Sequence, residues 1–534
     1  MVRHASAPDA PLTGPQRWGL AFAVLAALAL RLFHLGHQSL WVDEIFTWKA
    51  AIPHGPFGWA DLLDDTHGPL VSAFLHAWIG VFGDSEFSLR LPMALATVAL
   101  VPAIADLARR AVGERAYLPA AWLAALSPFV VWYGQEVRNY AFVLLWATLA
   151  LDATLAYRAS GRARDLALLV LWSTVGILSN LNGVLLLPVT FGALLFSPPR
   201  GRSGVLPLAV GLGVLLLVLS PWILRYLGVL EIHRLVPGRE ALPSEEPLRG
   251  ASTLSWPAIP FTFYVFSVGY SLGPSLRALH EQSAMAAIRP HLPVIALTGA
   301  LFGALALTGF AALGRRRFAR VLLAAAILLP LAGVSYFALM NFKPFNPRYL
   351  AVALPAWFAL LAAGWAAWSR PVRVLAGVLV CALFGVSLVQ HYSHAEYAKE
   401  DFRGAARDLA ARMAPGDSLV LVGGCSPLEY YQRLLPANAS RGRTYWLGYA
   451  RDDRMAPRFS TFVNRTGGAT WVLVSRPEDL DPGRRFEPWL VATYRPDARI
   501  RTGVRVYRIP PLVPRKLQTE SRKAVPGPPA TRKS

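Results

Sequence analysis

The sequence is poor in cysteine and in charge, and each shortage excludes a class of protein. Only two cysteines occur among 534 residues, Cys381 within an apolar stretch and Cys425 near the C-terminal end, which excludes a disulfide framework or a thiolate metal site. Charged residues make up 16%, below the roughly one quarter usual in soluble domains. The hydrophobic fraction is 54% and the mean hydropathy is +0.39. This composition indicates a membrane protein.

Motifs for ATP-driven chemistry and for nucleic-acid binding are also missing. No GxxxxGK(S/T) phosphate loop occurs, so ATP-driven chemistry is not expected. The formal net charge is +21, yet the arginines lie mostly in short clusters between apolar blocks, with no basic aromatic surface around them. We therefore expect no nucleic-acid partner. About 16 polar residues precede the first apolar block and no A-x-A cleavage site follows it, which indicates a retained helix and not a signal peptide.

Apolar blocks, mostly of 17 to 25 residues, recur through the first 390 positions and match the roughly 30 Å hydrocarbon core of a bilayer. We predict a multi-pass α-helical membrane protein with about eleven transmembrane helices, at 17–34, 90–108, 116–133, 139–157, 165–180, 183–197, 203–224, 292–313, 320–340, 348–369 and 371–390. The stretch 67–83 is apolar too, but it carries two histidines and ends in Gly-Asp. We expect it to lie in the membrane interface.

Arginine clusters predict the sidedness, because cytoplasmic loops carry an excess of Lys and Arg. If 67–83 does not span, the cytoplasmic loops hold Arg109, Arg110, Arg115, Arg158, Arg162, Arg164, Arg200, Arg202, Arg315, Arg316, Arg317, Arg320, Arg370 and Arg373. The outer loops hold few cations, chiefly Arg138, Lys343 and Arg348. Residues 1–16 are then cytoplasmic, 35–89 and 225–291 are outer loops of a transmembrane domain at 17–390, and the protein belongs to the plasma (inner) membrane.

The C-terminal part changes character after about residue 391. Asp401–Met413 has the pattern of an amphipathic helix, and 419–422, 471–474 and 504–509 have the pattern of short apolar strands. We therefore predict a small extracytoplasmic α/β domain at 391–513. Residues 514–534 are rich in Pro, Lys, Arg and Ser and are expected to form a disordered basic tail.

Two adjacent carboxylates, Asp43 and Glu44, lie in the first outer loop between Trp41 and Trp48. Aromatic residues mark the membrane interface, where a carboxylate is partly desolvated. A carboxylate that stays ionised there can act as general base toward a hydroxyl. The alternative is a pair of ordinary solvated loop acids.

His67 follows Asp64 and Asp65 at the start of the interfacial stretch. An Asp, Asp and His set this close in sequence can bind a divalent metal. The alternative is a histidine that caps a helix or hydrogen-bonds a loop, so a metal cofactor is possible and not required.

The remaining outer loops contribute cations. Glu136 and Arg138 lie in a very short loop, where Arg138 could bind a phosphate at headgroup depth or form a local pair with Glu136. Lys343 and Arg348 precede the tenth predicted span. Snorkelling explains many cations at span ends. Cations on the outer side oppose the preferred orientation, however, which favours phosphate binding.

At these residues the chain resembles membrane glycosyltransferases of the GT-C fold, in particular the family 39-like and RgtA/B/C/D-like enzymes, relatives of protein mannosyltransferases and aminoarabinose transferases. The matching pieces cover about residues 20–370 and are Ser39-Leu-Trp-Val-Asp43-Glu44, His67-Gly-Pro-Leu70, Gly83-Asp-Ser-Glu-Phe-Ser-Leu-Arg90-Leu-Pro92, Leu126-Ser-Pro-Phe129, Gln135-Glu136-Val-Arg138-Asn-Tyr140, and Arg348-Tyr-Leu350 with Pro355. Each motif is weak alone; together they are specific.

The resemblance implies an inverting transfer of a hexose or pentose from a polyprenyl-phosphate donor to a lipid, glycan or protein acceptor of the cell envelope, on the extracytoplasmic face. It implies Asp43, with Glu44 beside it, as the catalytic base or acceptor-orienting group. It further implies Glu136 and Arg138 near the donor and Arg348 at the lipid phosphate. Lys343 is a further phosphate-binding candidate from the charge of its loop alone. The alternative function is a transporter or flippase of lipid-linked saccharides, which would favour broken helices and polar groups at mid-bilayer.

Overall fold

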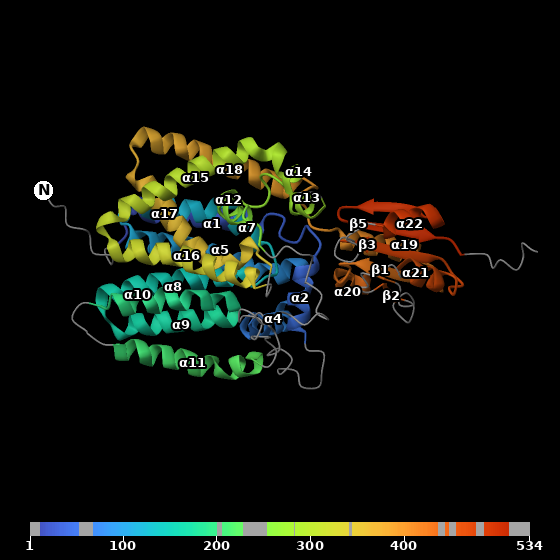
Figure 1. The fold of residues 1–534 in the computed structure, drawn as a ribbon, viewed down its shortest axis with the longest axis horizontal. Helices are drawn as coiled ribbons and strands as arrows, with labels where there is room; N and C mark the ends of the chain where they lie inside the picture. The colour runs from blue at the N-terminus through green and yellow to red at the C-terminus, as the bar shows by residue number, and fades with distance from the viewer. Residues whose placement is uncertain are drawn as a thin grey trace, which may run out of the picture. The chain divides into compact units, whose positions relative to one another are not determined.

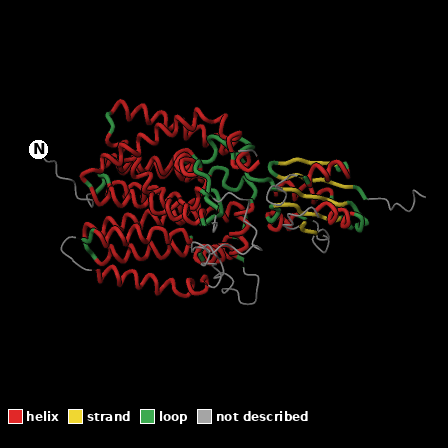
Figure 2. Tube along the Cα trace, viewed as in Figure 1, coloured by secondary structure: helices red, strands yellow, loops and turns green. Residues whose placement is uncertain are grey.

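The computed structural model describes residues 11–52, 68–199, 205–227, 254–281, 284–340, 344–435, 444–447, 455–476 and 485–511. The chain forms two compact units. One, called here the helical unit, comprises Met1–Gln38 and Asp43–Ala398, and the other, the C-terminal unit, comprises Ser39–Val42 and Lys399–Ser534. Figure 1 shows the helices of the first unit, and Figure 2 shows that the described strands all belong to the second.

The helical unit confirms the predicted multi-pass class. Seven described segments are long and apolar enough to cross a membrane: α5 (Glu86–Ala111), α8 (Tyr140–Ser160), α11 (Val205–Leu227), Met285–Arg315 with α15 (Leu292–Ala312), α16 (Arg317–Leu339), η6 (Pro347–Ala353) with α17 (Leu354–Ala367), and α18 (Arg370–Ser393). The bent pair α6 (Tyr117–Leu126) and α7 (Pro128–Gly134) makes an eighth. The other predicted spans fall on α1 (Gly14–Leu32), α9 (Ala163–Ser179), and η2 (Leu181–Leu186) with α10 (Leu187–Phe196). The count of eleven spans stays a prediction.

The stretch predicted to lie in the interface forms α4 (Pro69–Phe82), a helix of 14 residues. At 1.5 Å per residue it is about 21 Å long, short of a roughly 30 Å hydrocarbon core. Its N-cap Gly68 has φ 114°, and a Cβ there would lie 2.3 Å from the carbonyl oxygen of Leu178. Only glycine fits this close approach to α9. Between α11 and α15 the described residues form the short helices α12 (Ala258–Val268), α13 (Leu276–Glu281) and α14 (Ala284–Ile288).

Close packing in the helical unit depends on small residues between α15 and α17. A Cβ added at Gly309 would lie 2.0 Å from the Leu360 carbonyl oxygen, and one at Gly364 would lie 2.0 Å from that of Leu305. Glycines let the two backbones touch, as is usual for helices packed within membranes. The η6–α17 span is 83% buried and so forms the centre of the unit.

The C-terminal unit contains a mixed five-stranded sheet in the order β2-β1-β3-β5-β4. Strand β1 pairs in parallel with β2 and β3, and β5 pairs antiparallel with β3 and β4. The strands are β1 (Ser418–Gly423), β2 (Thr444–Leu447), β3 (Thr470–Ser475), β4 (Asp497–Arg501) and β5 (Val504–Ile509), and the helices are α19 (Phe402–Arg412), α20 (Pro427–Tyr431), α21 (Met455–Val463) and α22 (Phe486–Tyr494). The predicted α/β class is confirmed, and 512–534 lie outside the described residues.

The short segment Ser39–Val42 belongs to the C-terminal unit through specific contacts. The Leu40 backbone N–H donates to the Tyr431 hydroxyl at 2.8 Å, and the Ser39 hydroxyl accepts from the Arg403 backbone N–H at 3.1 Å. The Arg476 guanidinium lies 5.0 Å from the centre of the Trp41 ring. Hydrogen bonds and a cation–π contact therefore fix this segment within the unit.

Candidate active site

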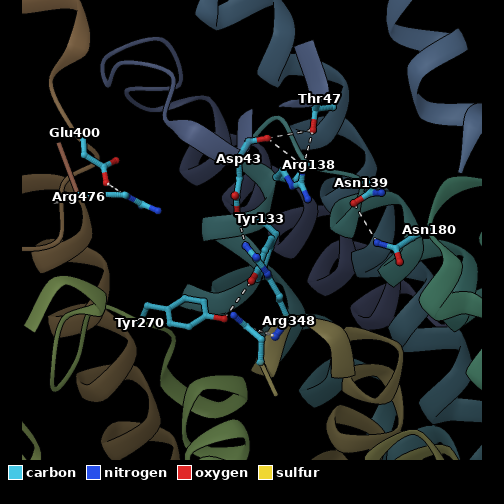
Figure 3. A network of polar contacts seen from close by, with 11 residues as sticks. Asp43, Thr47, Tyr133, Arg138, Asn139, Asn180, Tyr270, Arg348, Glu400 and Arg476 are labelled. Atoms are coloured by element: carbon cyan, nitrogen blue, oxygen red, sulfur yellow. Dashed lines mark hydrogen bonds and ion pairs between the residues drawn. The ribbon is translucent and has the colours of Figure 1, made fainter. Parts of the chain in front are cut away.

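The first turn of α2 (Val42–Ala51) carries Asp43, whose carboxylate is in direct contact with Arg348 (Figure 3). The Arg348 Nη1 donates to Asp43 Oδ2 across 305 positions of sequence, and the two side chains are 18% and 12% exposed. Arg348 is held at the start of η6, where the Asn346 side chain accepts a hydrogen bond from the Arg348 backbone N–H at 3.1 Å. Two residues predicted to share one site are thus neighbours.

The Arg348 guanidinium is not saturated by this contact. Its Nε is buried and has no hydrogen-bond partner in the part of the chain that the structure describes. Guanidinium presents donors in a planar fork that suits phosphate oxygens. Tyr349 and Tyr140 lie beside it, with ring centres 5.5 and 6.0 Å from the guanidinium carbon. Arg348 therefore combines a buried position with unused donor capacity.

Arg138 holds the backbone of the same helical turn. Its Nη1 donates to the Asp43 carbonyl oxygen at 3.0 Å and to the Thr47 hydroxyl at 2.9 Å (Figure 3). It comes from the short loop between α7 and α8, next to Asn139, whose side chain bonds the Ser179 carbonyl and the Asn180 amide. Arg138 thus contacts Asp43 through the main chain and not through the carboxylate.

Glu44 makes a separate, fully buried ion pair with Arg90 of α5. The Arg90 Nε and Nη2 each donate to a Glu44 oxygen at 2.8 Å, and the side chains are 1% and 0% exposed. The Val137 backbone N–H also donates to Glu44, at 2.9 Å. The Arg90 Nη1 donates to the carbonyls of Leu35 and Gln38. This cluster joins α2 to α5 and to the loop that carries Arg138.

Tyrosines that sequence reasoning did not select surround the Asp43–Arg348 pair. The hydroxyls of Tyr133 and Tyr270 lie 3.1 Å apart, and the centre of the Tyr140 ring lies 5.9 Å from the Arg138 guanidinium carbon. Burial raises the pKa of Tyr270, so its hydroxyl stays protonated and can donate hydrogen bonds. Selecting Tyr133 and Tyr270 from the sequence would have required knowing that Tyr270 folds back onto Tyr133, which no local pattern shows.

Arg31 is a second group that sequence reasoning missed. It is fully buried in α1, and its guanidinium donates to the carbonyls of Ala124 at 2.9 Å and of Ala125. These carbonyls precede the 53° bend between α6 and α7, where Pro128 lacks an N–H. Arg31 thus satisfies acceptors left by the bend that carries Tyr133. A charge within a span was the available signal.

Other predicted site residues have less defined surroundings. Glu136 is 1% exposed and acts electrostatically on Tyr133 and Tyr270. Lys343 and the candidate metal ligands Asp64, Asp65 and His67 lie outside the described residues. Among the residues that are described, no group of three His, Cys, Asp or Glu side chains is arranged to hold a metal ion.

Comparison with known proteins identifies the fold. Residues 66–224 match the family model described as dolichyl-phosphate-mannose-protein mannosyltransferase. The structure is similar to that of ArnT from Cupriavidus metallidurans in the apo state, with TM-score 0.57, 15% identity and coverage of 93% of this chain and 98% of that chain. The chain has the GT-C glycosyltransferase fold.

The same ArnT bound to undecaprenyl phosphate matches with TM-score 0.50, 14% identity and coverage of 92% and 98%. AglB from Archaeoglobus fulgidus, in complex with an inhibitory peptide and a dolichol-phosphate, gives TM-score 0.47, 12% identity and coverage of 86% and 69%. No curated protein sequence matches the chain significantly. The recognition made from the motifs is confirmed for the fold, and the family match supports the glycosyltransferase class. That match includes Glu136 and Arg138 but not Asp43 or Arg348.

Proposed function

We propose that this GT-C protein transfers a hexose or pentose from a polyprenyl-phosphate donor to an acceptor hydroxyl of the cell envelope, on the extracytoplasmic face and with inversion. The direct contact of Asp43 with Arg348 carries the proposal, because it joins a candidate base to a candidate phosphate ligand. The match of residues 66–224 to a mannosyltransferase family supports the reaction class. A similar structure solved with undecaprenyl phosphate supports the donor class.

In the proposed reaction the acceptor oxygen forms a bond to the anomeric carbon while the bond from that carbon to the phosphate oxygen breaks. Asp43 takes the proton of the acceptor hydroxyl, and the polyprenyl phosphate leaves with the electron pair. Arg348 offsets the negative charge that grows on the phosphate, which lowers the barrier without a nucleotide. Attack from the side opposite the leaving group inverts the configuration.

In this proposal the Asp43–Arg348 ion pair determines the order of two steps, donor binding and activation of the base. Asp43 and a donor phosphate compete for the Arg348 guanidinium, so phosphate binding draws Arg348 away from the carboxylate. A nearby cation favours the ionised form of a carboxylate, and its withdrawal makes Asp43 a better proton acceptor. We therefore propose that donor binding precedes activation of the base.

The contacts of Glu44 and Arg138 support positioning roles in the same reaction. The Glu44 oxygens are occupied by Arg90 and Val137, so we propose that Glu44 holds α2 in place and does not take the proton itself. Arg138 fixes the Asp43 main chain. Glu136 and Lys343 stay candidates for the donor side, and a metal at Asp64, Asp65 and His67 stays open.

Labelled polyprenyl-phosphate sugars and envelope acceptors, incubated with purified protein, test the proposal. Asp43→Asn keeps the size of the side chain and removes the base, so we expect transfer to fall about 10²- to 10⁴-fold. Asp165→Asn, at the start of α9, is the matched control and is expected to transfer normally. Undiminished transfer by Asp43→Asn would exclude the base role. Saccharide flipping in liposomes without transfer by the wild type would favour a transporter.

A further inference from the structure

A hollow of about 680 Å³ lies along α18, lined by Trp365, Arg370, Arg373, Val374, Gly377, Val378 and Cys381. Trp365 comes from α17, and the other lining residues recur every three or four positions of α18, so they share one face of that helix. A Cβ at Gly377 would lie 3.0 Å from the Trp365 ring. Glycine at this position thus leaves room for the ring beside the helix and creates the floor of the hollow.

The lining is amphiphilic along its length. Arg370 and Arg373 stand at one end, in the first turn of α18, and no lining residue is acidic. Below them the face is apolar and open, with Val374 61% and Val378 62% exposed and Cys381 exposed. From Arg370 to Cys381 the helix rises about 16 Å, which is half of a roughly 30 Å hydrocarbon core.

The two arginines are electrostatically uncompensated. Neither guanidinium has an ion-pair or hydrogen-bond partner within the described ranges. Two cations close together repel each other, and the first turn of a helix is the end at which cations are disfavoured by the dipole. An anion seated between them removes both costs. The apolar face below fits the hydrocarbon chain of the same molecule.

We propose that this hollow binds a membrane phospholipid with an anionic headgroup, the phosphate held by Arg370 and Arg373 and one acyl chain lying over Val374, Gly377 and Cys381. The site is separate from the proposed donor site. Arg348 begins the η6–α17 span, whereas the hollow lies where that span ends and α18 begins. The lipid therefore binds at the opposite end of the span and takes no part in sugar transfer.

Native mass spectrometry of the full chain in detergent micelles, with added phosphatidylglycerol or phosphatidylcholine, tests the proposal. The wild type is expected to retain phosphatidylglycerol in preference to phosphatidylcholine. The double variant Arg370→Gln/Arg373→Gln is expected to bind it roughly thirtyfold more weakly, since each basic residue near a membrane surface adds a factor of about five. Cys381→Trp fills the apolar end with the charges intact and is expected to reduce retention as well.

The matched control is Arg315→Gln/Arg317→Gln, which removes two exposed arginines that do not line the hollow. It is expected to retain phosphatidylglycerol like the wild type. If this control loses phosphatidylglycerol as much as the double variant does, the loss comes from general surface charge and the proposal is overturned. Equal retention of both lipids would do the same, and so would displacement of phosphatidylglycerol by excess inorganic phosphate, since the site would then take free anions. Unchanged melting temperatures of the variants exclude misfolding as the cause.

Discussion

Replacing Glu44 by Gln tests whether this carboxylate positions the site or performs chemistry. The change preserves shape and removes the negative charge that faces Arg90. In the native protein the Arg90 Nε and Nη2 and the Val137 N–H all donate to the two Glu44 oxygens, at 2.8, 2.8 and 2.9 Å. Glutamine keeps one acceptor and turns an NH₂ group toward the guanidinium. Arg90 is then buried without its counter-charge.

The expected loss of unfolding free energy follows from the burial of the Glu44–Arg90 pair. Both side chains are at most 1% exposed, so water cannot replace the lost interaction. Removing one member of a buried ion pair costs about 3–5 kcal/mol of unfolding free energy. The control Glu114→Gln affects a carboxylate that is 34% exposed, and we expect it to cost no more than about 1 kcal/mol.

Denaturant unfolding in detergent, run beside transfer assays, separates the two roles. A positioning role predicts that Glu44→Gln loses stability and transfer together. It also predicts that Arg90→Met added to Glu44→Gln costs less than the sum of the single changes, because the pair is already broken. A Glu44→Gln protein as stable as the wild type but unable to transfer sugar would refute this reasoning and make Glu44 a catalytic residue.

Two further predictions concern Asp43 with Arg348, and Asp408 with Arg501. If a phosphate and Asp43 compete for Arg348, Asp43→Asn binds fluorescent polyprenyl phosphate more tightly than the wild type, whereas Arg348→Ala binds it about ten- to a hundredfold more weakly; weaker binding by Asp43→Asn contradicts the competition. In the C-terminal unit, hydrogen bonds from Arg501 at 2.6 and 2.8 Å lower the pKa of Asp408. Its stabilising contribution is full above the unfolded carboxyl pKa of about 3.9 and is lost as the pH falls through the lower folded value. The difference in melting temperature between wild type and Asp408→Asn should be present at pH 7 and vanish in stronger acid; an equal difference at both would contradict the assignment.

The sequence was sufficient for the span-length helices and for most of the sheet, because both produce local patterns. Span-length apolar blocks located the long helices of the first unit, and short apolar runs located β1, β3 and β5. Helices α2, α12, α13 and α14 were missed, because they are short and fall in segments predicted to be outer loops. Strand β4 (Asp497–Arg501) was missed because four of its five residues are exposed, so it lacks an apolar run. Strand β2 (Thr444–Leu447) has only four residues, too few for a clear alternation.

The site was only partly predictable, because its contacts join distant positions. Charge at span ends selected Asp43, Arg138 and Arg348, and their unusual placement in a hydrophobic chain was the signal. This charge signal could not show that Arg90 forms an ion pair with Glu44, since Arg90 stands near the start of a span and resembles an ordinary flanking arginine. Partner choice is decided by helix packing, which single-sequence patterns do not contain.

The two adjacent carboxylates of α2 illustrate how packing divides their roles. Successive residues of a helix point about 100° apart, so Asp43 and Glu44 meet different neighbours. Glu44 points toward α5 and the Val137 backbone, where two arginine nitrogens and an amide enclose it. Asp43 accepts a hydrogen bond from the Arg348 Nη1, and the buried Nε of the same guanidinium has no hydrogen-bond partner among the described residues. Glu44 can leave Arg90 only if its surroundings unfold. A donor phosphate, in contrast, can replace Asp43 at the Arg348 guanidinium. The proposed mechanism requires this replacement, because it frees Asp43 to act as base when the donor binds.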